Sequence, residues 1–445
     1  MLITNSTLIT WEPENRILEN HGLRILGDRI THVQPSADLI RSFPDEDRLD
    51  ARGQYALPGG ICAHTHFYGA FARGMAIPGS PPAAFPEILS RLWWPLDRSL
   101  DAESIRYSVL PCLVDAIRYG TTTLFDHHAS PNAVDGSLDI IEDAVEEAGL
   151  RAVLCYEVTD RDGAQRMKAG ITENLRFLKK QKSPRVAAMF GLHASLTLSA
   201  ASLDACREAA PSDTGFHIHA AEHAVDEDDS LAKSGLRVAE RLNRHGILGS
   251  RSIAAHGVHF DAREIEVMRD TRAWLSHQPR SNMNNGVGVA AIESMLKAGV
   301  RVCLGNDGFS NAMWEEWKAA YLVHKASHLD PRRMGGDDLA RIAIYNNGEL
   351  ADEYFPGQVI GRLRAGAAAD IILVDYHPHT PLTAANAPWH IVFGFQPGMV
   401  TTTLVGGRLL MKDRQLLTLD EERITARARE IAPRVWRRYE EHASA

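Results

Sequence analysis

The chain has 445 residues, of which 44% are hydrophobic and 24% charged, so its composition is that of a globular protein large enough for more than one domain. Its net charge of -9 argues against a nucleic-acid or anionic-membrane partner. The sequence has no apolar run of the roughly 20 residues that a membrane helix needs, and its N-terminus lacks the basic and apolar regions of a secretory signal.

Short runs of alternating apolar and polar residues occupy both flanks of the chain, over residues 1–55 and 358–418. Alternation indicates strands with one buried face, and Gly406-Gly407 is typical of a hairpin turn. Because neither flank has enough strands for a stable sheet of its own, we expect both termini to form one small β-sandwich domain. The charged tail, residues 419–445, predicts a helix.

Between the flanks, residues 56–357 alternate strand-like and helix-like runs. Most of the strand-like runs are short, apolar and rich in β-branched residues, as buried parallel strands are. Eight such units over roughly 250 residues predict an α/β fold, the (β/α)₈ TIM barrel. The predicted strands are Gly60–His66, Thr121–Asp126, Arg151–Glu157, Arg185–His193, Gly215–His219, Ser252–His256, Ala273–His277 and Val300–Asp307.

Polar side chains end these strands. The active site of such a barrel lies at the C-terminal ends of its strands, so groups far apart in sequence can converge there. The alternative is that these histidines are buried for structural reasons only. That explanation is reasonable for any single histidine but poor for the whole set. The residues at the predicted ends are His64, His66, Asp126, Glu157, His193, His219, His256, His277 and Asp307.

The predicted ends contain the donors of a metal site. Residues two apart on a strand face the same side, so His64 and His66 form a pair of imidazole ligands. Zinc and similar divalent ions take neutral imidazoles and carboxylates, and we predict that His219 and Asp307 complete the set, with one position left for water. His217 shares a strand face with His219 and is a rival ligand, although its greater depth favours a packed role.

Groups that transfer protons stand near these ligands. Glu222, three residues after His219, can reach the barrel mouth and carry a proton to a leaving group. Asp307 is placed to accept a proton from water, and His256 to orient the water or polarise the substrate. The fourth strand ends in His193 without a lysine that would bridge a second metal, which favours a single ion. The sequence also lacks a nucleotide-binding glycine loop and a serine nucleophile elbow.

Several side chains are candidates for substrate binding. Trp93 and Trp94, in a proline-rich stretch, suit a substrate lid or core packing, and the sequence leaves both open. His128, after the second strand, suits either a pocket wall or a locally satisfied loop. The full candidate set is Arg73, Trp93, Trp94, His128, His193 and Arg280.

The cysteines show no disulfide framework and no Cys-x-x-Cys pair. Each lies in an apolar strand or helix pattern, which favours small buried side chains. This usage fits a reducing cytoplasm. The five are Cys62, Cys112, Cys155, Cys206 and Cys303.

These segments jointly resemble the amidohydrolase superfamily, in its branch of aminohydrolases and chlorohydrolases. Residues 58–66 resemble the first-strand signature of that branch, and His219–Glu222 resembles its fifth-strand motif. Residues 255–257 resemble the sixth-strand site. Residues 304–308 resemble the eighth-strand segment, where Asn306 stands in place of the usual threonine.

The resemblance implies a hydrolytic deaminase that attacks a small nitrogen heterocycle with a water activated by one divalent metal ion, zinc or, in some members, iron. It assigns the metal to the four predicted ligands, proton transfer to Glu222 and Asp307, contact with the water or substrate to His256, and a pocket position to His193. It also implies a homodimer that acts on a small-molecule substrate, while the net charge and hydropathy argue against nucleic acid and membrane as partners.

A narrower resemblance, to aminohydrolases of unassigned reaction associated with selenium metabolism, lies in residues 67–75, 91–97, 126–133 and 155–163. Two alternatives stay open. One is another hydrolysis of a carbon–nitrogen bond, such as ring opening of a cyclic amide. The other is a non-catalytic metal-binding accessory protein of selenium metabolism, against which the intact set of proton-transfer groups argues.

Overall fold

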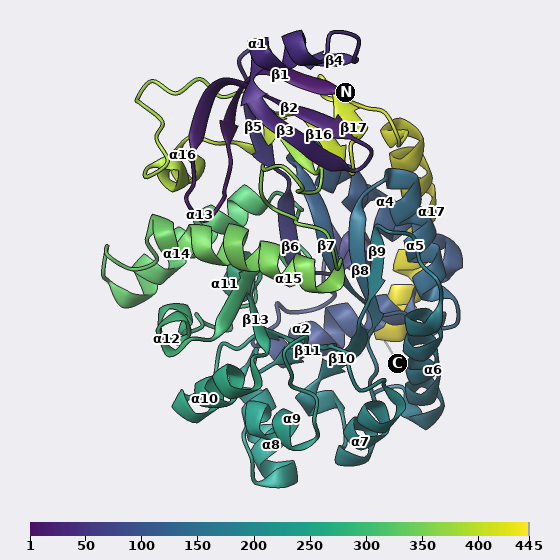
Figure 1. Cartoon of the computed structure of the whole chain (residues 1–445). Coiled ribbons are helices and arrows are strands. Elements are labelled where there is room, and N and C mark those ends of the chain that lie inside the picture. The colour runs from purple at the N-terminus through teal and green to yellow at the C-terminus, as the bar shows by residue number, and fades with distance from the viewer. Residues whose placement is uncertain (444–445) are drawn as a thin grey trace.

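A parallel barrel forms the centre of the protein, in a computed structural model that describes residues 1–443 (Figure 1). Its strands are β6 (Gly60–Thr65), β7 (Thr121–His128), β8 (Arg151–Tyr156), β9 (Val186–Ala188), β10 (Phe190–Ala194), β11 (Phe216–Ala220), β12 (Ile253–His256), β13 (Trp274–His277) and β14 (Arg301–Leu304). They form two hydrogen-bonded arcs, β6–β9 and β10–β14. Bridges between Thr65 and Asp307, and between Val158 and Leu192, join the arcs at both seams. The predicted α/β barrel is therefore confirmed.

The fourth predicted strand, over residues 185–193, is split in two. The Met189 N–H donates to the Leu154 carbonyl on β8, whereas the next N–H, of Phe190, donates to the Gly215 carbonyl just before β11, each at 3.0 Å. The chain therefore changes partners at Met189. For this reason β9 ends one arc and β10 begins the other.

Helices cover the outside of the barrel, and the first of them shows why they begin and end where they do. α4 (Ala102–Tyr119) begins at Asp101, whose carboxylate accepts from the Ser104 N–H, and ends at Gly120 in the left-handed region, with φ 75°. The helices that follow are α5 (Ser137–Ala148), α6 (Gly163–Lys179), α7 (Ala200–Ala209), α8 (Ala224–Ser234), α9 (Val238–Arg244), α10 (Ala262–Thr271), α11 (Pro279–Asn284), α12 (Ile292–Ala298), α13 (Met313–His328), α14 (Gly336–Ala340) and α15 (Asn346–Tyr354).

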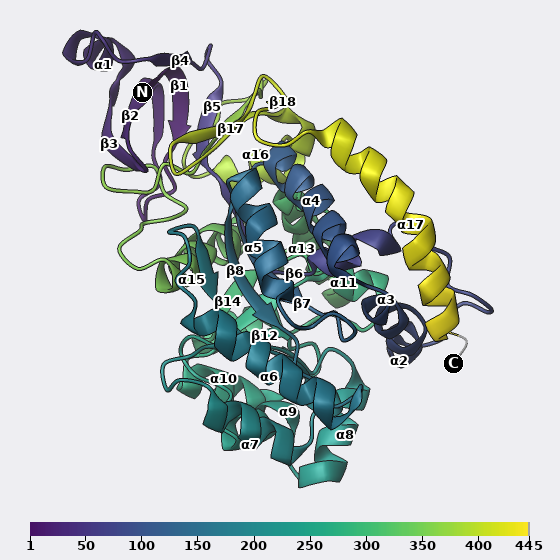
Figure 2. The same ribbon diagram turned by 90° about the vertical axis from the view of Figure 1, so that its right-hand side faces the viewer.

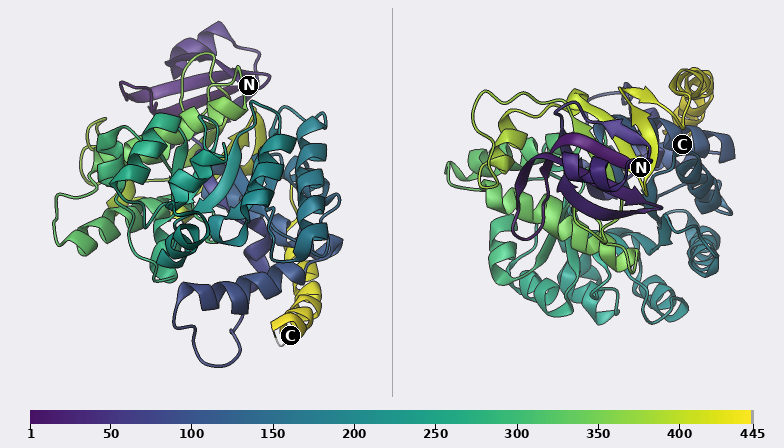
Figure 3. Two further views of the ribbon diagram at one scale, coloured as in Figure 1. Left: turned by 90° about the horizontal axis from the view of Figure 1, so that it is seen from below. Right: turned by 45° about the horizontal axis from the view of Figure 1, so that its top comes forward.

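An insertion between β6 and α4 lies over the barrel mouth. It holds the short helices η1 (Phe67–Ala72), α2 (Phe85–Ile88), η2 (Leu89–Trp93) and α3 (Trp94–Arg98). η2 is a π-helical turn, a feature often found at functional sites. From below, the insertion projects beyond the barrel beside the end of the chain (Figure 3, left).

Both ends of the chain build a second sheet beside the barrel (Figure 1). Its N-terminal strands are β1 (Leu2–Ile9), β2 (Ile17–Leu26), β3 (Arg29–Pro35), β4 (Arg48–Asp50) and β5 (Tyr55–Pro58). Its C-terminal strands are β15 (Ile371–Val374), β16 (Val400–Val405), β17 (Arg408–Lys412) and β18 (Gln415–Leu416). The two sets meet where β5 pairs antiparallel with β15. Short helices α1 (Ser36–Ser42) and α16 (Ala387–Phe393) flank the strands.

The two termini meet in this sheet, through the pairing of β5 with β15. Within residues 1–443 its nine strands share one hydrogen-bonded sheet, and the expected stacking of two layers stays a prediction. A buried ion pair fixes the sheet to the barrel, since Arg151 Nε at the start of β8 lies 2.6 Å from Asp370 Oδ2 just before β15.

The C-terminal helix α17 (Glu421–Ala443) leaves the small sheet and runs along the barrel to the insertion at the mouth (Figure 2). Its apolar stripe is buried at Ile424, Ile431, Val435 and Tyr439. Neither α17 nor any other helix in residues 1–443 combines the length and apolar character needed to cross a membrane.

Candidate functional site

Four side chains from three strand ends converge at the barrel mouth. His64 comes from β6 and His66 directly follows that strand, whereas His219 comes from β11 and Asp307 from the turn after β14. His66 Nε2 lies 3.0 Å from His219 Nε2 and 3.0 Å from Asp307 Oδ1. His64 Nε2 lies 3.2 Å from the same Asp307 oxygen. The four predicted metal ligands are therefore brought together around one point.

The seam between β14 and β6 sets this geometry. Asp307 has φ 58°, in the left-handed region, and its carbonyl accepts from the Thr65 hydroxyl at 2.9 Å and the His66 N–H at 3.0 Å. Gly305 allows the close approach, because a Cβ there would lie 2.8 Å from the backbone N and O of His64. The turn therefore points the Asp307 carboxylate back at the histidines of β6.

The outer ring nitrogens fix how the imidazoles face. His66 Nδ1 donates to the His127 carbonyl at 2.6 Å, and His219 Nδ1 donates to the His193 carbonyl at 2.8 Å. Each Nε2 of a neutral imidazole can therefore present a lone pair to the common point. Two imidazole lone pairs and a carboxylate oxygen this close repel one another unless a positive charge, either a proton on Nε2 or a metal ion, lies among them. The donor set fits a divalent metal of the zinc type.

The electrostatics of the ligands also call for a positive charge. Burial lowers the pKa of His66, but the hydrogen bond and the negative charge of Asp307 outweigh it and raise that pKa to about 9. Burial raises the pKa of Asp307, but hydrogen bonds from His64 and His66 hold it well below its usual range. Asp307 is therefore a carboxylate that requires cationic neighbours.

Glu222 and His256 lie beside the ligands. His256 Nδ1 lies 2.8 Å from Asn282 Oδ1, and its Nε2 lies 3.6 Å from Glu222 Oε2. Glu222 Oε1 also accepts from Asn285 Nδ2 at 3.3 Å. Burial, reinforced by the nearby charge of Asp307 and opposed by His256, raises the pKa of Glu222 to about 7. A carboxyl group with this pKa can both give and take a proton at neutral pH.

Glu157 lies behind the ligands, among histidines. Its Oε1 is 3.4 Å from His66 Nδ1 and 3.3 Å from His127 Nδ1, and its Oε2 is 3.8 Å from His193 Nε2. Burial raises the pKa of Glu157 to about 8. Asp307, in contrast, lies within 3.2 Å of both His64 and His66 through Oδ1.

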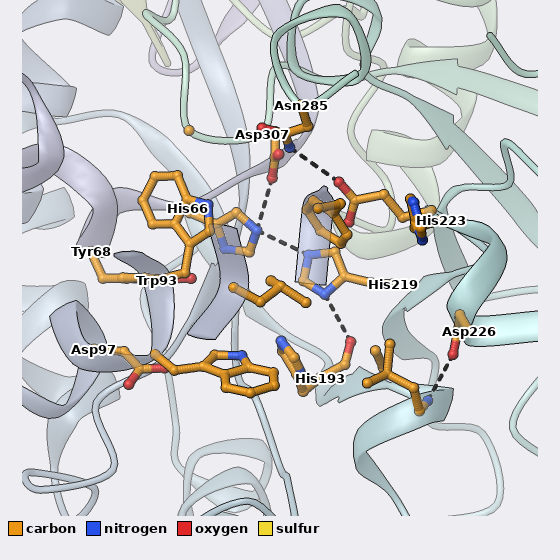
Figure 4. A pocket seen from close by; sticks show the side chains of 17 residues that line it. His66, Tyr68, Trp93, Asp97, His193, His219, His223, Asp226, Asn285 and Asp307 are labelled. Carbon is orange, nitrogen blue, oxygen red and sulfur yellow. Dashed lines mark hydrogen bonds and ion pairs between the residues drawn. The ribbon is translucent and has the colours of Figure 1, made fainter. Parts of the chain in front are cut away.

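A pocket opens over this cluster (Figure 4). Its polar floor includes His66, His219 and Asp307, and the insertion supplies an aromatic wall. The wall residues and their neighbours are Tyr68, Phe85, Leu89, Trp93 and Trp94. A polar floor below an aromatic wall suits a flat, nitrogen-rich ring.

The six candidate substrate-binding residues divide into two groups. Trp93, Trp94 and His193 line the pocket, and the other three do not. Arg73 pairs with Asp115 at 3.0 Å and is mostly exposed. His128 is buried with its Nε2 2.9 Å from the Ser130 hydroxyl, and Arg280 is engaged by Glu316, Glu315 and Ser310.

Asp97 is a pocket residue that sequence reasoning missed. On α3, it lies in the pocket wall, is 1% exposed, and accepts from Arg161 Nη2 at 2.7 Å through Oδ2. Its other oxygen is buried without a hydrogen-bond partner in the part of the chain that the structure describes. The sequence offered one indication of this residue. Asp97 follows closely after the candidate aromatic pair, Trp93 and Trp94.

The sequence of this chain is similar to a known protein family and to characterised enzymes. The model of the amidohydrolase family matches residues 55–410. A curated relative, the 5-methylthioadenosine/S-adenosylhomocysteine deaminase of Pelotomaculum thermopropionicum, is 31% identical over 98% of both chains.

Solved structures share the fold. A zinc-bound adenosine deaminase from Xanthomonas campestris matches with a TM-score of 0.84 at 22% identity over 98% of both chains. The zinc complex of the atrazine chlorohydrolase TrzN from Arthrobacter aurescens TC1 matches with a TM-score of 0.81 at 23% identity, over 97% of this chain and 100% of that one. The similarity to both structures extends over the barrel and the small sheet.

Proposed function

Since this chain belongs to the amidohydrolase family, we propose that the heterocycle it deaminates is an aminopurine of the adenosine class. The protein is a metal-dependent hydrolase of carbon–nitrogen bonds, a deaminase of a small heterocycle. The observation that carries this function is the convergence of the imidazole nitrogens of His64, His66 and His219 on the Asp307 carboxylate. Glu222 lies with His66, His219 and Asp307 in the pocket lining.

We infer that His64, His66, His219 and Asp307 hold one zinc ion, for which iron is the alternative. The donor set of three nitrogens and one carboxylate oxygen supports zinc. When bound, the metal supplies Lewis-acid activation of a water molecule at neutral pH. The hydrogen bonds of the outer ring nitrogens keep the imidazoles oriented for this purpose.

The proton transfers follow from the two carboxyl groups. Asp307 accepts a proton as the water oxygen bonds to the amino-bearing carbon, and its Oδ2 is held by the Ser281 hydroxyl at 2.5 Å. Glu222 protonates substrate nitrogen, and the carbon–nitrogen bond breaks to release ammonia. One water proton ends on ammonia and the other on the ring of the lactam product. His256 donates to the attacking or developing oxygen, which stabilises the tetrahedral intermediate.

The pocket supports the proposed class of substrate. Tyr68, Trp93 and Trp94 offer aromatic faces for a purine ring. The relative with 31% identity is named for adenosine derivatives, which agrees with a purine in this pocket.

The test is ammonia release by zinc-loaded protein from adenosine, 5′-deoxyadenosine, adenine, guanine and aminotriazines, with product masses measured in parallel. We expect turnover of the adenosine-type compounds, with oxygen in place of the amino group. Turnover of guanine or triazines alone would overturn the substrate class. A product that has gained water and kept all its nitrogen would instead favour the cyclic-amidase alternative.

Three further predictions from the sequence stay predictions. They are the homodimer, the cytoplasmic location, and the kinship with the selenium-associated group, which is known as SsnA. Light scattering on purified protein measures the first.

A further inference from the structure

The end of α17 reaches the insertion that forms the pocket wall. Figures 2 and 3 both show its last turns beside α2 and α3. Two ion pairs hold α17 to the start of α4. Arg438 Nη1 lies 2.8 Å from Asp101 Oδ2, and Arg434 Nη2 lies 2.7 Å from Glu103 Oε2. The C-terminal helix is thus fixed against the barrel before it meets the insertion.

Tyr439 holds the insertion at its π-helical turn. Pro95, four residues after Arg91, has no N–H, so the α-helical hydrogen bond to the Arg91 carbonyl cannot form. The Tyr439 hydroxyl donates to this carbonyl at 2.6 Å. Tyr439 is only 2% exposed, so its hydroxyl is committed to this bond. Trp93 and Trp94, in the pocket wall, lie between Arg91 and Pro95.

Trp436 makes a similar bond to the other half of the wall. Its indole Nε1 donates to the Phe71 carbonyl at 3.0 Å, near the end of η1, where carbonyls lack helical partners. η1 also carries Tyr68, whose ring meets Trp93 edge to face at a centroid distance of 6.4 Å. The two wall segments therefore touch each other inside the pocket and are both fastened to α17 outside it.

We propose that Tyr439 and Trp436 are positioning residues for substrate binding, which hold the aromatic wall of the pocket in place from the C-terminal helix. The role of the wall in catalysis rests on the proposed function. The hydrogen bonds that attach the wall to α17 do not depend on that function. Loss of either bond frees a carbonyl of the insertion and loosens the wall. Substrate affinity should fall, while the ligands and Glu222 keep their places.

The test is Tyr439→Phe, which removes one hydroxyl and keeps the buried ring. Tyr376→Phe is the matched control, because the Tyr376 hydroxyl bonds His390 at 2.8 Å, away from the pocket residues. We expect faster amide hydrogen exchange in residues 85–98 of Tyr439→Phe only. With adenosine as probe, we expect KM to rise about threefold to tenfold, the range for losing one hydrogen bond, while kcat stays within about twofold.

Trp436→Phe is a second variant and should accelerate exchange in residues 67–75. The exchange measurement needs no substrate, so a failure of adenosine turnover would count against the proposed function and leave this test standing. Exchange in residues 85–98 equal to that of the wild type would overturn the proposal. An equal acceleration across the barrel strands would overturn it too, because Tyr439 would then act on global stability alone.

Discussion

Asp307 shows how one residue serves two purposes at this site. One carboxylate oxygen faces His64 and His66, and the other accepts from Ser281. Both contacts depend on a backbone with φ 58°, a conformation that costs about 1 kcal/mol or more outside glycine. The pairing of that turn with β6 holds the conformation, so local strain and ligand geometry share one cause.

Glu222→Gln tests proton transfer at the residue scale. The amide keeps the shape of the side chain but cannot deliver a proton, so we expect kcat/KM to fall about 10²- to 10⁴-fold. Because Glu222 is not a ligand, the metal content should stay that of the wild type. Glu208→Gln, at an exposed position on α7, is the control. An unchanged kcat/KM in Glu222→Gln would remove this residue from the mechanism.

At the same scale, the sequence predicts some site residues better than others. Strand alternation placed His64 and His66 on one face, and strand ends brought His219 and Asp307 to the same mouth. Asp97 was missed because its position in the pocket wall depends on the path of the insertion. The repeating pattern of apolar and polar residues does not predict that path. Arg280 follows a strand closely, yet its guanidinium is engaged by the buried carboxylate of Glu316, a partner that only the folded chain supplies.

Among the elements, the start of α4 joins two parts of the molecule. Asp101 caps this helix through the Ser104 N–H and receives Arg438 from α17. Burial raises the pKa of Asp101, but the hydrogen bonds from Arg438 and Ser104 outweigh it and lower that pKa to about 2. Helix capping and docking of the C-terminal helix thus depend on the same ionised carboxylate.

Asp101→Asn tests this element by its pH dependence. A folded pKa near 2 lies below the value of about 3.9 for an unfolded aspartate, so the charge stabilises the fold above pH 4 and less as the pH falls toward 2. We expect the wild type to unfold at a higher temperature than Asp101→Asn at pH 7. That difference should close between about pH 4 and pH 2. Asp213→Asn, at an exposed carboxylate, should show no such gap, and a gap constant with pH would contradict the assignment.

For the whole molecule, the ligands span both arcs of the barrel. His64 and His66 belong to the arc of β6–β9, whereas His219 belongs to the arc of β10–β14. Asp307 lies at the seam where the second arc meets the first. The barrel itself was predictable from repeated strand–helix units. The meeting of both termini beside it was expected from the alternating flanks, but the pairing of β5 with β15 was not, because it joins distant segments that sequence patterns do not match to each other.

Removal of the metal should therefore loosen the whole barrel. Binding at a free metal concentration about 1,000 times Kd stabilises the fold by about 4 kcal/mol, which is about 4 °C in the thermal midpoint for a chain of this length. We expect a chelator to lower the midpoint by this order and zinc to restore it. His66→Ala should not respond to either addition. A shift of equal size in that variant would place the metal elsewhere.

The pairing of β5 with β15 also orders events in time. Tyr55–Pro58 finds its partner in Ile371–Val374, which a ribosome adds roughly 300 residues later, about 15 to 60 seconds at ordinary rates of synthesis. Until then β5 presents an unpaired edge that can recruit other chains. We therefore expect the yield of folded protein to respond to translation speed, because slower synthesis lengthens the time for which this edge is open.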